Sequence, residues 1–374
     1  METLVTSRNG NAKEIETATF NINLQEHGDG HSFVSENYAQ LKAANIFSAL
    51  IPVELGGLGW KYTEMCSYLR ELSKSCSSTS LALSMHQHII AANVWKYKNG
   101  QGSEELLKKV SSNQLVLVST GGGDWLSSSG EMEKVEGGFL VTAQKNFASQ
   151  SPVGNILVTS ARYNDPTDGP QVLHFGVPLT SPGVELKDNW YAMGMRGTGS
   201  GSVSLKKVFV PETSITLRRP AGEFHPFWNV ALTVAMPLIM SVYVGIAEKA
   251  ASIARSFAQK KDDPQTPFLL GELFNSLTTA QVMVDDMVRI TNDLDFKPIN
   301  ENGNNILMRK SVAARACIQT VQKAMETVGG QSYLQSTGIE KLYRDILAVE
   351  FHPLPEKEQQ LFTANYLLNR KLVG

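Results

Sequence analysis

The chain has 374 residues, of which 42% are hydrophobic and 19% are charged, and its formal net charge is −2. A chain of this size can form two or three domains, and a near-neutral balance without a basic run argues against nucleic acid as the main partner. The three cysteines, Cys66, Cys76 and Cys317, are widely spaced, so we expect reduced thiols in a cytoplasmic protein and no metal site. We find no signal pattern at the start and no apolar run of about 18 residues, and therefore expect no membrane interaction.

Three zones follow one another along the chain, and they differ in the spacing of their apolar residues. Residues 1–112 show helical spacing, residues 113–217 show short β-branched and aromatic runs between turns, and residues 218–374 show long amphipathic patterns. The predicted strands are 115–119, 138–142, 155–160, 174–178 and 202–210, and the predicted long helices are roughly 228–260, 267–294, 304–329 and 355–370. Pro237 is expected to kink the first of these helices. This order predicts an α+β protein with an N-terminal helical domain, a central antiparallel β domain and a C-terminal four-helix bundle.

The most informative stretch lies at 191–211, where glycines and small hydroxyl residues precede an apolar strand that ends in proline. The small residues are Gly194, Gly197, Thr198, Gly199 and Ser200. Such residues let a backbone turn tightly and approach a ligand or another backbone closely.

Together with four other stretches in the same order, this segment resembles the acyl-CoA dehydrogenase superfamily of flavoproteins. The other stretches are 51–59, 117–119, 145–149 and the C-terminal pair 326–333 and 340–345. The resemblance spans nearly the whole chain, and it implies a flavin between the β domain and the helical bundle.

The resemblance also implies which residues hold the flavin. Val118 and Ser119 would meet the pyrimidine edge, Phe147 would cover a ring face and Ser149 would reach N5. The adjacent glycines Gly329 and Gly330 would let the backbone pass close to a flavin nucleotide of a neighbouring subunit, although Gly-Gly alone is more often a helix C-cap. Phe147, taken alone, is equally compatible with a core position.

The chain departs from the family at the catalytic base. A dehydrogenase needs a carboxylate to remove the α-proton, and the family commonly places a glutamate eight residues after the Arg-Asp pair. That position is Pro353, and the alternative position on the first bundle helix falls on Ala235 and Met236. His352 stands beside the missing base, which is the pattern of the flavin-dependent monooxygenases that share this fold.

This resemblance implies oxygenation of a small apolar or aromatic substrate through a reduced-flavin C4a-(hydro)peroxide. Imidazole suits such a role because it can exchange a proton near neutral pH. We place the substrate between Ser149, His86 and His352. His88 cannot share a helical face with His86, and we prefer His86 as the one that points at the flavin. Glu350 is an alternative base that would restore acyl-CoA or acyl-carrier dehydrogenase chemistry, and a non-catalytic flavin-binding homologue is a second alternative.

The expected nucleotide contacts are also altered. An arginine that the family often uses after the first bundle helix is absent, and Lys260 or Lys261 would have to replace it as a phosphate partner. We expect a flavin and prefer FAD to FMN, with FMN, or loosely held FAD that is exchanged as a reduced substrate, as alternatives. A separate flavin reductase or an electron-transfer flavoprotein is the expected redox partner. The resemblance implies a homotetramer formed through the C-terminal helices. The apolar faces near 304–329 and 358–368 argue against an isolated monomer, so we expect a homotetramer or homodimer. Arg344 and Asp345 are interpreted as a structural ion pair that closes the last helices.

Overall fold

A computed structural model of the chain describes residues 29–120, 122 and 124–372, so the first 28 residues of the predicted N-terminal domain lie outside the described part. The N-terminal helices are α1 (Ser35–Ala43), α2 (Tyr62–Ser75), α3 (Ser77–Lys98) and α4 (Glu104–Asn113). The C-terminal helices are α5 (Phe227–Ala258), α6 (Thr266–Thr291), α7 (Asn300–Val328), α8 (Ile339–Ile346) and α9 (Glu356–Leu367). All strands described lie between them, as predicted for the α+β class.

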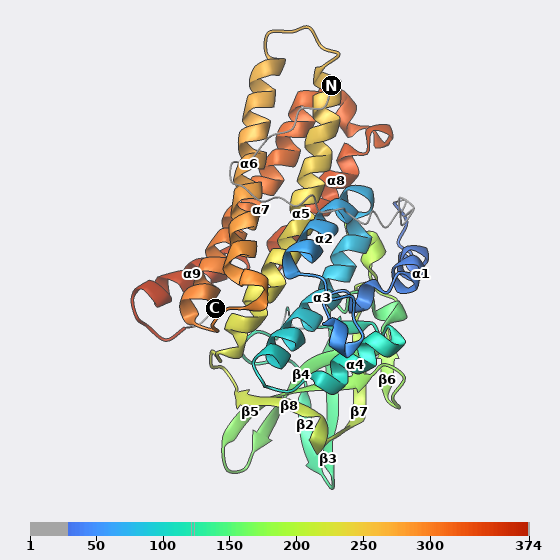
Figure 1. Ribbon diagram of the computed structural model, residues 1–374, viewed down its shortest axis with the longest axis vertical. Helices are drawn as coiled ribbons and strands as arrows, with labels where there is room; N and C mark the ends of the chain where they lie inside the picture. The colour runs from blue at the N-terminus through green and yellow to red at the C-terminus, as the bar shows by residue number, and fades with distance from the viewer. Residues whose placement is uncertain (1–28, 121, 123, 373–374) are drawn as a thin grey trace.

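Figure 1 shows the long helices α5, α6 and α7 standing side by side and extending away from the sheet, with α2 and α3 against α5. The strands are β1 (Leu117–Ser119), β2 (Glu131–Val135), β3 (Gly138–Lys145), β4 (Ile156–Asp165), β5 (Gly169–Pro178), β6 (Val184–Leu186), β7 (Val203–Pro211) and β8 (Ile215–Pro220). The sequence predicted β1, β3, β4, β5 and β7. It missed β2, β6 and β8, which are short or rich in charged residues.

The sheet is mixed rather than purely antiparallel, which corrects the prediction. Its order is β6-β7-β3-β2-β4-β5-β8, with β1 paired to β4. Both β1 and β2 run parallel to β4, whereas the remaining neighbours are antiparallel. Parallel pairing follows because β1 and β4 are joined by a crossover through β2 and β3 rather than by a hairpin.

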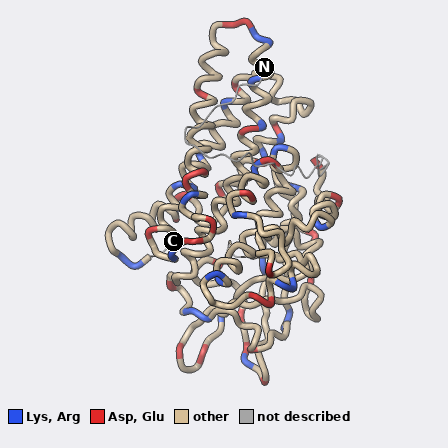
Figure 2. The backbone as a smooth tube through the Cα atoms, viewed as in Figure 1, with Lys and Arg blue, Asp and Glu red and all other residues tan. Residues whose placement is uncertain are grey.

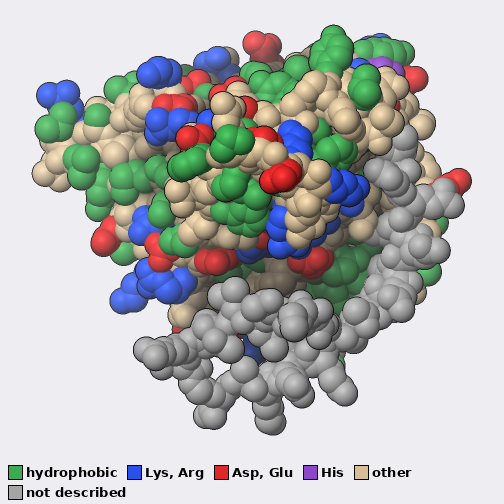
Figure 3. All heavy atoms as spheres, turned by 90° about the horizontal axis from the view of Figure 1, so that it is seen from above, with side chains coloured by type: hydrophobic (Ala, Val, Ile, Leu, Met, Phe, Trp, Pro, Cys, Tyr) green, Lys and Arg blue, Asp and Glu red, His purple; other side chains and the backbone are tan. Residues whose placement is uncertain are grey.

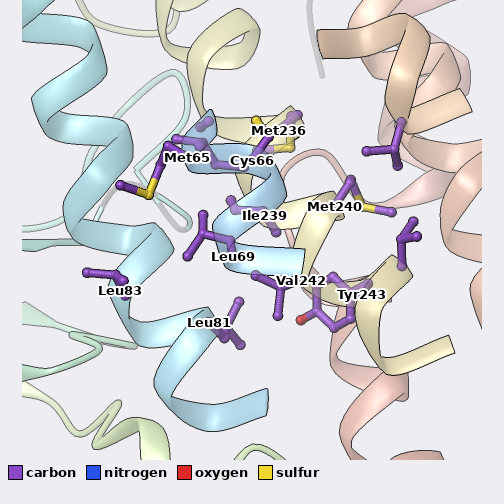
Figure 4. Close-up of a cluster of buried hydrophobic side chains, with 14 of the residues drawn as sticks. Met65, Cys66, Leu69, Leu81, Leu83, Met236, Ile239, Met240, Val242 and Tyr243 are labelled. Atoms are coloured by element: carbon purple, nitrogen blue, oxygen red, sulfur yellow. The ribbon is translucent and has the colours of Figure 1, made fainter. Parts of the chain in front are cut away.

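The apolar side chains form two cores, one among the helices and one in the β domain. In the helical core, Met65, Cys66 and Leu69 of α2 pack with Ile239 and Met240 of α5 (Figure 4). Figure 4 also shows Tyr243 beside Val242 at the edge of this cluster.

The close crossing of α2 and α5 depends on Gly245. A Cβ at this position would lie 2.1 Å from the Arg70 carbonyl oxygen and 2.0 Å from Ser73 Oγ. Glycine is therefore needed for the backbones to approach.

The first bundle helix, α5, continues through Pro237 from Phe227 to Ala258. Proline has no N–H, so the carbonyl four residues earlier, on Thr233, loses its usual helical partner. Thr291 Oγ1 of α6 donates to that carbonyl at 3.0 Å, and Tyr62 Oη of α2 donates to the neighbouring Val234 carbonyl at 2.7 Å. Side chains of two other helices therefore satisfy the backbone around the proline.

By length and composition α5 is also apolar enough to cross a membrane, which corrects the expectation that the chain has no apolar run of about 18 residues. The most apolar stretch of α5 is 94% buried inside the fold, which is typical of the central helix of a protein core. Figure 2 shows acidic and basic residues interspersed along the chain, in keeping with the balanced composition.

Candidate active site

Strand β1 forms the boundary between the two cores, and this fixes the direction of Ser119. Leu117 belongs to the helical core and Val118 to the β core. Since successive side chains of a strand point to opposite faces, the half-buried Ser119 shares the helix-facing side with Leu117. The Val118 side chain is buried in the β core, so only its backbone is available to a ligand.

The predicted ring-covering residue, Phe147, is 67% exposed and has a φ of 60°. A bulky residue in this left-handed region is uncommon and costs about 1–3 kcal/mol, which makes such an outlier a candidate functional position. The Phe147 ring meets the Trp190 ring edge to face, with centroids 6.2 Å apart at 84°. Phe147 is thus not a core residue, and its aromatic face is open.

Ser149 belongs to a chain of hydroxyl groups that leads into the glycine-rich stretch. Its Oγ lies 2.7 Å from Ser200 Oγ, which lies 2.7 Å from Thr198 Oγ1. Thr198 in turn donates to the Met195 carbonyl at 2.9 Å. This chain holds the Ser149 hydroxyl in a fixed, buried position.

The glycine-rich stretch packs against α8, and a single carboxylate ties the two together. Asp345 accepts hydrogen bonds from the Met195 N–H at 2.6 Å, from Ser77 Oγ at 2.5 Å and from Lys341 Nζ at 2.9 Å. Arg344 pairs instead with Glu340 and Asp29. The interpretation of Arg344 and Asp345 as one mutual ion pair is therefore wrong: neighbouring positions on a helix point in different directions.

Gly194 → Ala is expected to destabilise the protein by about 1–3 kcal/mol, the usual effect of overpacking a close contact. A Cβ at Gly194 would lie 2.2 Å from the Arg344 carbonyl oxygen and 2.8 Å from the Asp345 nitrogen, and both are backbone atoms that cannot swing aside. Urea unfolding measures the change. The control is Gly271→Ala in α6, where a Cβ meets nothing within 4 Å and the helix should be unchanged or slightly more stable. Equal stability of the two variants would contradict the packing argument.

His352 lies between α8 and α9, and residues from α5 and α7 hold it in place. Its Nε2 lies 2.6 Å from Tyr243 Oη. Lys310 Nζ donates to the carbonyl oxygens of His352 and Leu354 at 2.9 and 3.0 Å. Tyr243 is fully buried and Lys310 is 1% exposed.

The electrostatic surroundings keep His352 neutral. Burial, together with the charges of Lys310 and His88, lowers the pKa of His352 to about 3. Burial also lowers the pKa of Lys310 to about 8, an effect that the charges of Glu350 and Glu356 oppose. The sequence suggested an imidazole that exchanges a proton near neutral pH. In the structure it is an uncharged hydrogen-bonding group instead.

His86 was the preferred pocket histidine, but the structure gives it a different role. It is fully buried, its Nε2 lies 2.7 Å from the Phe47 carbonyl oxygen, and the Leu117 N–H donates to its Nδ1 at 3.0 Å. With both nitrogens bound to backbone, His86 fixes β1 to the N-terminal domain and has no nitrogen left for a ligand. His88, unlike His86, is only half-buried, and its charge contributes to lowering the pKa of His352.

The glycine loop after β1 approaches the His352 loop. A Cβ at Gly122 would lie 3.9 Å from Pro353 Cγ. Gly121 and Gly123, on either side of it, lie outside the described residues. The alternative base, Glu350, is exposed on the 3-10 turn Leu347–Phe351.

The predicted nucleotide glycines stand at the end of α7. Gly329 has a φ of 78° and caps the helix, and Gly330 is exposed with nothing within 4 Å of an added Cβ. Lys261 Nζ donates to the Thr327 carbonyl at 2.7 Å and would lie 3.9 Å from a Cβ at Gly329. A lysine therefore does stand next to these glycines.

The structure groups the predicted residues into separate sets. His88 acts on His352 electrostatically, whereas Ser149 belongs to the hydroxyl chain, and no contact between the described residues joins it to His352. Sequence reasoning missed Tyr243 and Lys310. The sequence did contain an indication that Lys310 is buried, because this charged residue falls within an apolar stripe of α7. The stripe is formed by Ile306, Leu307, Ala313, Ala314 and Cys317.

Within residues 29–120, 122 and 124–372, no group of three His, Cys, Asp or Glu side chains is placed to hold a metal ion. A surface groove of about 400 Å³ lies away from His352, between α6 and α7. It is lined by Val282, Met283, Asp286, Met308, Arg309 and Val312.

A sheet between two helical domains, with a glycine-rich segment packed on the helix before the last loop, defines the acyl-CoA dehydrogenase class of fold. Family models agree: the acyl-CoA dehydrogenase N-terminal domain matches residues 13–114 and the C-terminal domain matches residues 238–356. Together they match more than half of the chain. The chain belongs to the acyl-CoA dehydrogenase family and is a flavin-dependent oxidoreductase.

Relatives include both dehydrogenases and oxygenases. The chain is 23% identical over 364 residues to cyclohex-1-ene-1-carbonyl-CoA dehydrogenase of Syntrophus aciditrophicus, covering 93% of this chain and 84% of the relative. It is 22% identical over 404 residues to dibenzothiophene monooxygenase of Mycolicibacterium goodii, covering 98% and 95%. Among solved structures, FMN-bound TdsC from Paenibacillus sp. A11-2 superposes with a TM-score of 0.78 at 18% identity, covering 91% of this chain and 92% of that one.

Proposed function

We propose that this oxidoreductase is an oxygenase that uses reduced flavin to insert one oxygen atom into a small apolar or aromatic substrate. The observation that carries the proposal is the neutral imidazole of His352, which lies next to the position where the family's dehydrogenases need a glutamate. The likeness to dibenzothiophene monooxygenase and to TdsC supports the same choice.

The residues present fit a flavin. Phe147 offers an open aromatic face, held by a strained backbone and flanked by a perpendicular indole, to a flat apolar ring. Ser119 stands on the helix-facing side of β1, and the Val118 backbone can hydrogen-bond to a polar ring edge. Because Thr198 donates to Met195, Ser200 donates to Thr198 and Ser149 donates to Ser200, so the Ser149 oxygen can present an acceptor to the N–H at the reactive nitrogen of a reduced ring.

Reduced flavin, when bound, supplies the two electrons with which one atom of O₂ becomes water while the other enters the substrate. The part of the protein in this chemistry is to position the flavin and the substrate and to shield the reacting atoms from solvent. His352 gives a neutral hydrogen-bonding group at the reacting side, and His88 of α3 acts on it electrostatically. The exposed Glu350 would have to leave its surface position before it could act as a dehydrogenase base.

The proposal also covers the kind of flavin and the source of its electrons. Gly329 and Gly330 with Lys261 beside them would suit the phosphates of FAD, whereas the FMN bound by TdsC favours the smaller cofactor. We propose a separate flavin reductase as the electron source rather than an electron-transfer flavoprotein, because an oxygenase needs delivery of reduced flavin.

We also propose that the chain assembles as a homotetramer or homodimer. Leu361, Leu367 and Leu368 of the last helical segment are between 51% and 67% exposed, and Val312 of α7 is 38% exposed. Figure 3 shows hydrophobic side chains gathered among charged ones on the face seen from above. Burial of such surface against a second copy would stabilise the assembly.

An anaerobic titration with FAD and FMN, each oxidised and reduced, tests the proposed function. We expect reduced flavin to bind at least about tenfold tighter than oxidised flavin, a difference of about 1.4 kcal/mol. Rapid mixing of the reduced complex with oxygen should then give a transient near-ultraviolet absorption before oxidised flavin appears. Anaerobic bleaching of bound oxidised flavin by acyl-CoA would instead establish a dehydrogenase, and failure to bind any flavin would establish a non-catalytic homologue.

A further inference from the structure

We propose that Tyr243 is a positioning residue that holds the His352 imidazole in the Nδ1–H tautomer, so that the ring offers a hydrogen-bond donor, not a lone pair, to the reactants. The functional consequence rests on the proposed oxygenase function. The assignment of the tautomer does not rest on that function, because it follows from contacts within the chain.

The contact joins two elements that are far apart in the sequence. Tyr243 lies in the middle of α5, 109 residues before His352, and its Oη is 2.6 Å from His352 Nε2. The two ring centroids are 5.4 Å apart at 59°. Tyr243 is fully buried, and its hydroxyl has no second partner in the described part of the chain.

The direction of this hydrogen bond follows from that burial. If Nε2–H donated to the phenol, the phenol hydrogen would point into the protein with no acceptor, and buried donors without a partner are rare because they are unfavourable. The phenol must therefore donate and Nε2 must accept. Burial raises the pKa of Tyr243 far above its usual value, with the charges of Asp345 and Cys317 acting in the same direction, so the phenol keeps its proton.

The second nitrogen of the ring then carries the only imidazole proton. His352 is neutral at physiological pH because burial, Lys310 on α7 and His88 on α3 all disfavour its charged form. A neutral ring whose Nε2 accepts must be protonated at Nδ1. His352 Nδ1 has no hydrogen-bond partner among the described residues, so this N–H is available to a ligand.

Lys310 makes the arrangement specific by fixing the backbone under the ring. Its ammonium group donates to the carbonyls on both sides of Pro353, those of His352 and Leu354. The side chain is thus held from α5 and the main chain from α7. The unpaired Nδ1–H of this half-buried ring can then stabilise negative charge on an oxygen atom of a reactant, but that nitrogen cannot serve as a general base.

The test is NMR of the full-length protein labelled with ¹⁵N-histidine, recorded without flavin. Long-range ¹H–¹⁵N correlations distinguish the two neutral tautomers, and His352→Gln identifies the signal. We expect the Nδ1–H pattern for His352 in the wild type and a shift towards the Nε2–H tautomer in Tyr243→Phe. The matched control is Tyr62→Phe, which removes another buried hydroxyl of the same core but leaves His352 untouched. An Nε2–H pattern in the wild type, or an unchanged pattern in Tyr243→Phe, would overturn the inference.

The functional consequence has its own measurement. In the flavin-loaded enzyme, Tyr243→Phe is expected to lower product formed per reduced flavin by about 10- to 100-fold, at or below the lower end of the effect of a group that itself transfers a proton because the imidazole is retained, and Tyr62→Phe is not. If Tyr243→Phe had an altered tautomer but formed as much product per reduced flavin as the wild type, the tautomer would not matter for turnover. An Nδ1–H ring in a chain that never oxygenates would contradict the proposed function alone.

Discussion

Replacement of His352 by glutamine is expected to lower oxygenation of the substrate by about 100-fold, while reduced flavin binds within about twofold of the wild-type affinity. Glutamine reaches the position of Nε2, so it can still accept the hydrogen bond from Tyr243 and preserve the packing of the loop. It leaves no donor where Nδ1 stood. The product yield per reduced flavin and the dissociation constant of the reduced flavin are measured side by side.

The comparison with His352→Asn sharpens this experiment. The shorter amide places its polar atoms near the position of Nδ1 but cannot reach Tyr243. If the free ring nitrogen is what assists the reaction, the asparagine variant should retain activity within about tenfold of wild type and exceed the glutamine variant. Full activity in His352→Gln would contradict a role for the imidazole. A loss of flavin binding in both variants would assign His352 to the cofactor site and not to the chemistry.

The second large effect is a loss of stability in mild acid. Burial lowers the pKa of His86 and His88 to about 4, and that of His174 and His352 to about 3. The unfolded chain protonates these rings near pH 6.5, whereas the folded chain does not, so the unfolded state binds more protons below that pH. The free energy of unfolding should therefore fall as the pH drops from about 6.5 towards 4. Each histidine contributes up to about 1.4 kcal/mol per pH unit.

Urea unfolding at pH 7, 6 and 5 measures this slope, and His174→Gln is the matched variant. The His174 ring nitrogen Nε2 accepts a hydrogen bond from Arg219 at 3.0 Å, and the glutamine oxygen can take its place without binding a proton. The variant should show a slope smaller by up to about 1.4 kcal/mol per pH unit, with most of the difference between pH 6 and 5. Equal slopes in both proteins, or stability that does not change between pH 6.5 and 5, would show that these rings are not held neutral by the fold.

The histidines of α3 show where sequence reasoning reached its limit. Spacing established that His86 and His88 lie on different faces of one helix, but not which face meets the pocket. That choice depends on the rotation of α3 against β1, which the backbone contacts of Phe47 and Leu117 with His86 fix. The predicted order of motifs was right, but His86, the histidine we preferred as the one that points at the flavin, has a structural role.

The sequence by itself determined the order of helical and β segments and the family. These follow from local periodicity, turn residues and motifs, all of which are written in neighbouring positions of the chain. Only the tertiary structure decided the parallel pairing of β1 with β4, the buried Lys310 under the His352 loop and the contact between Tyr243 and His352. Each of these joins segments dozens of residues apart, and such a pairing depends on how whole elements pack rather than on the pattern of any one of them.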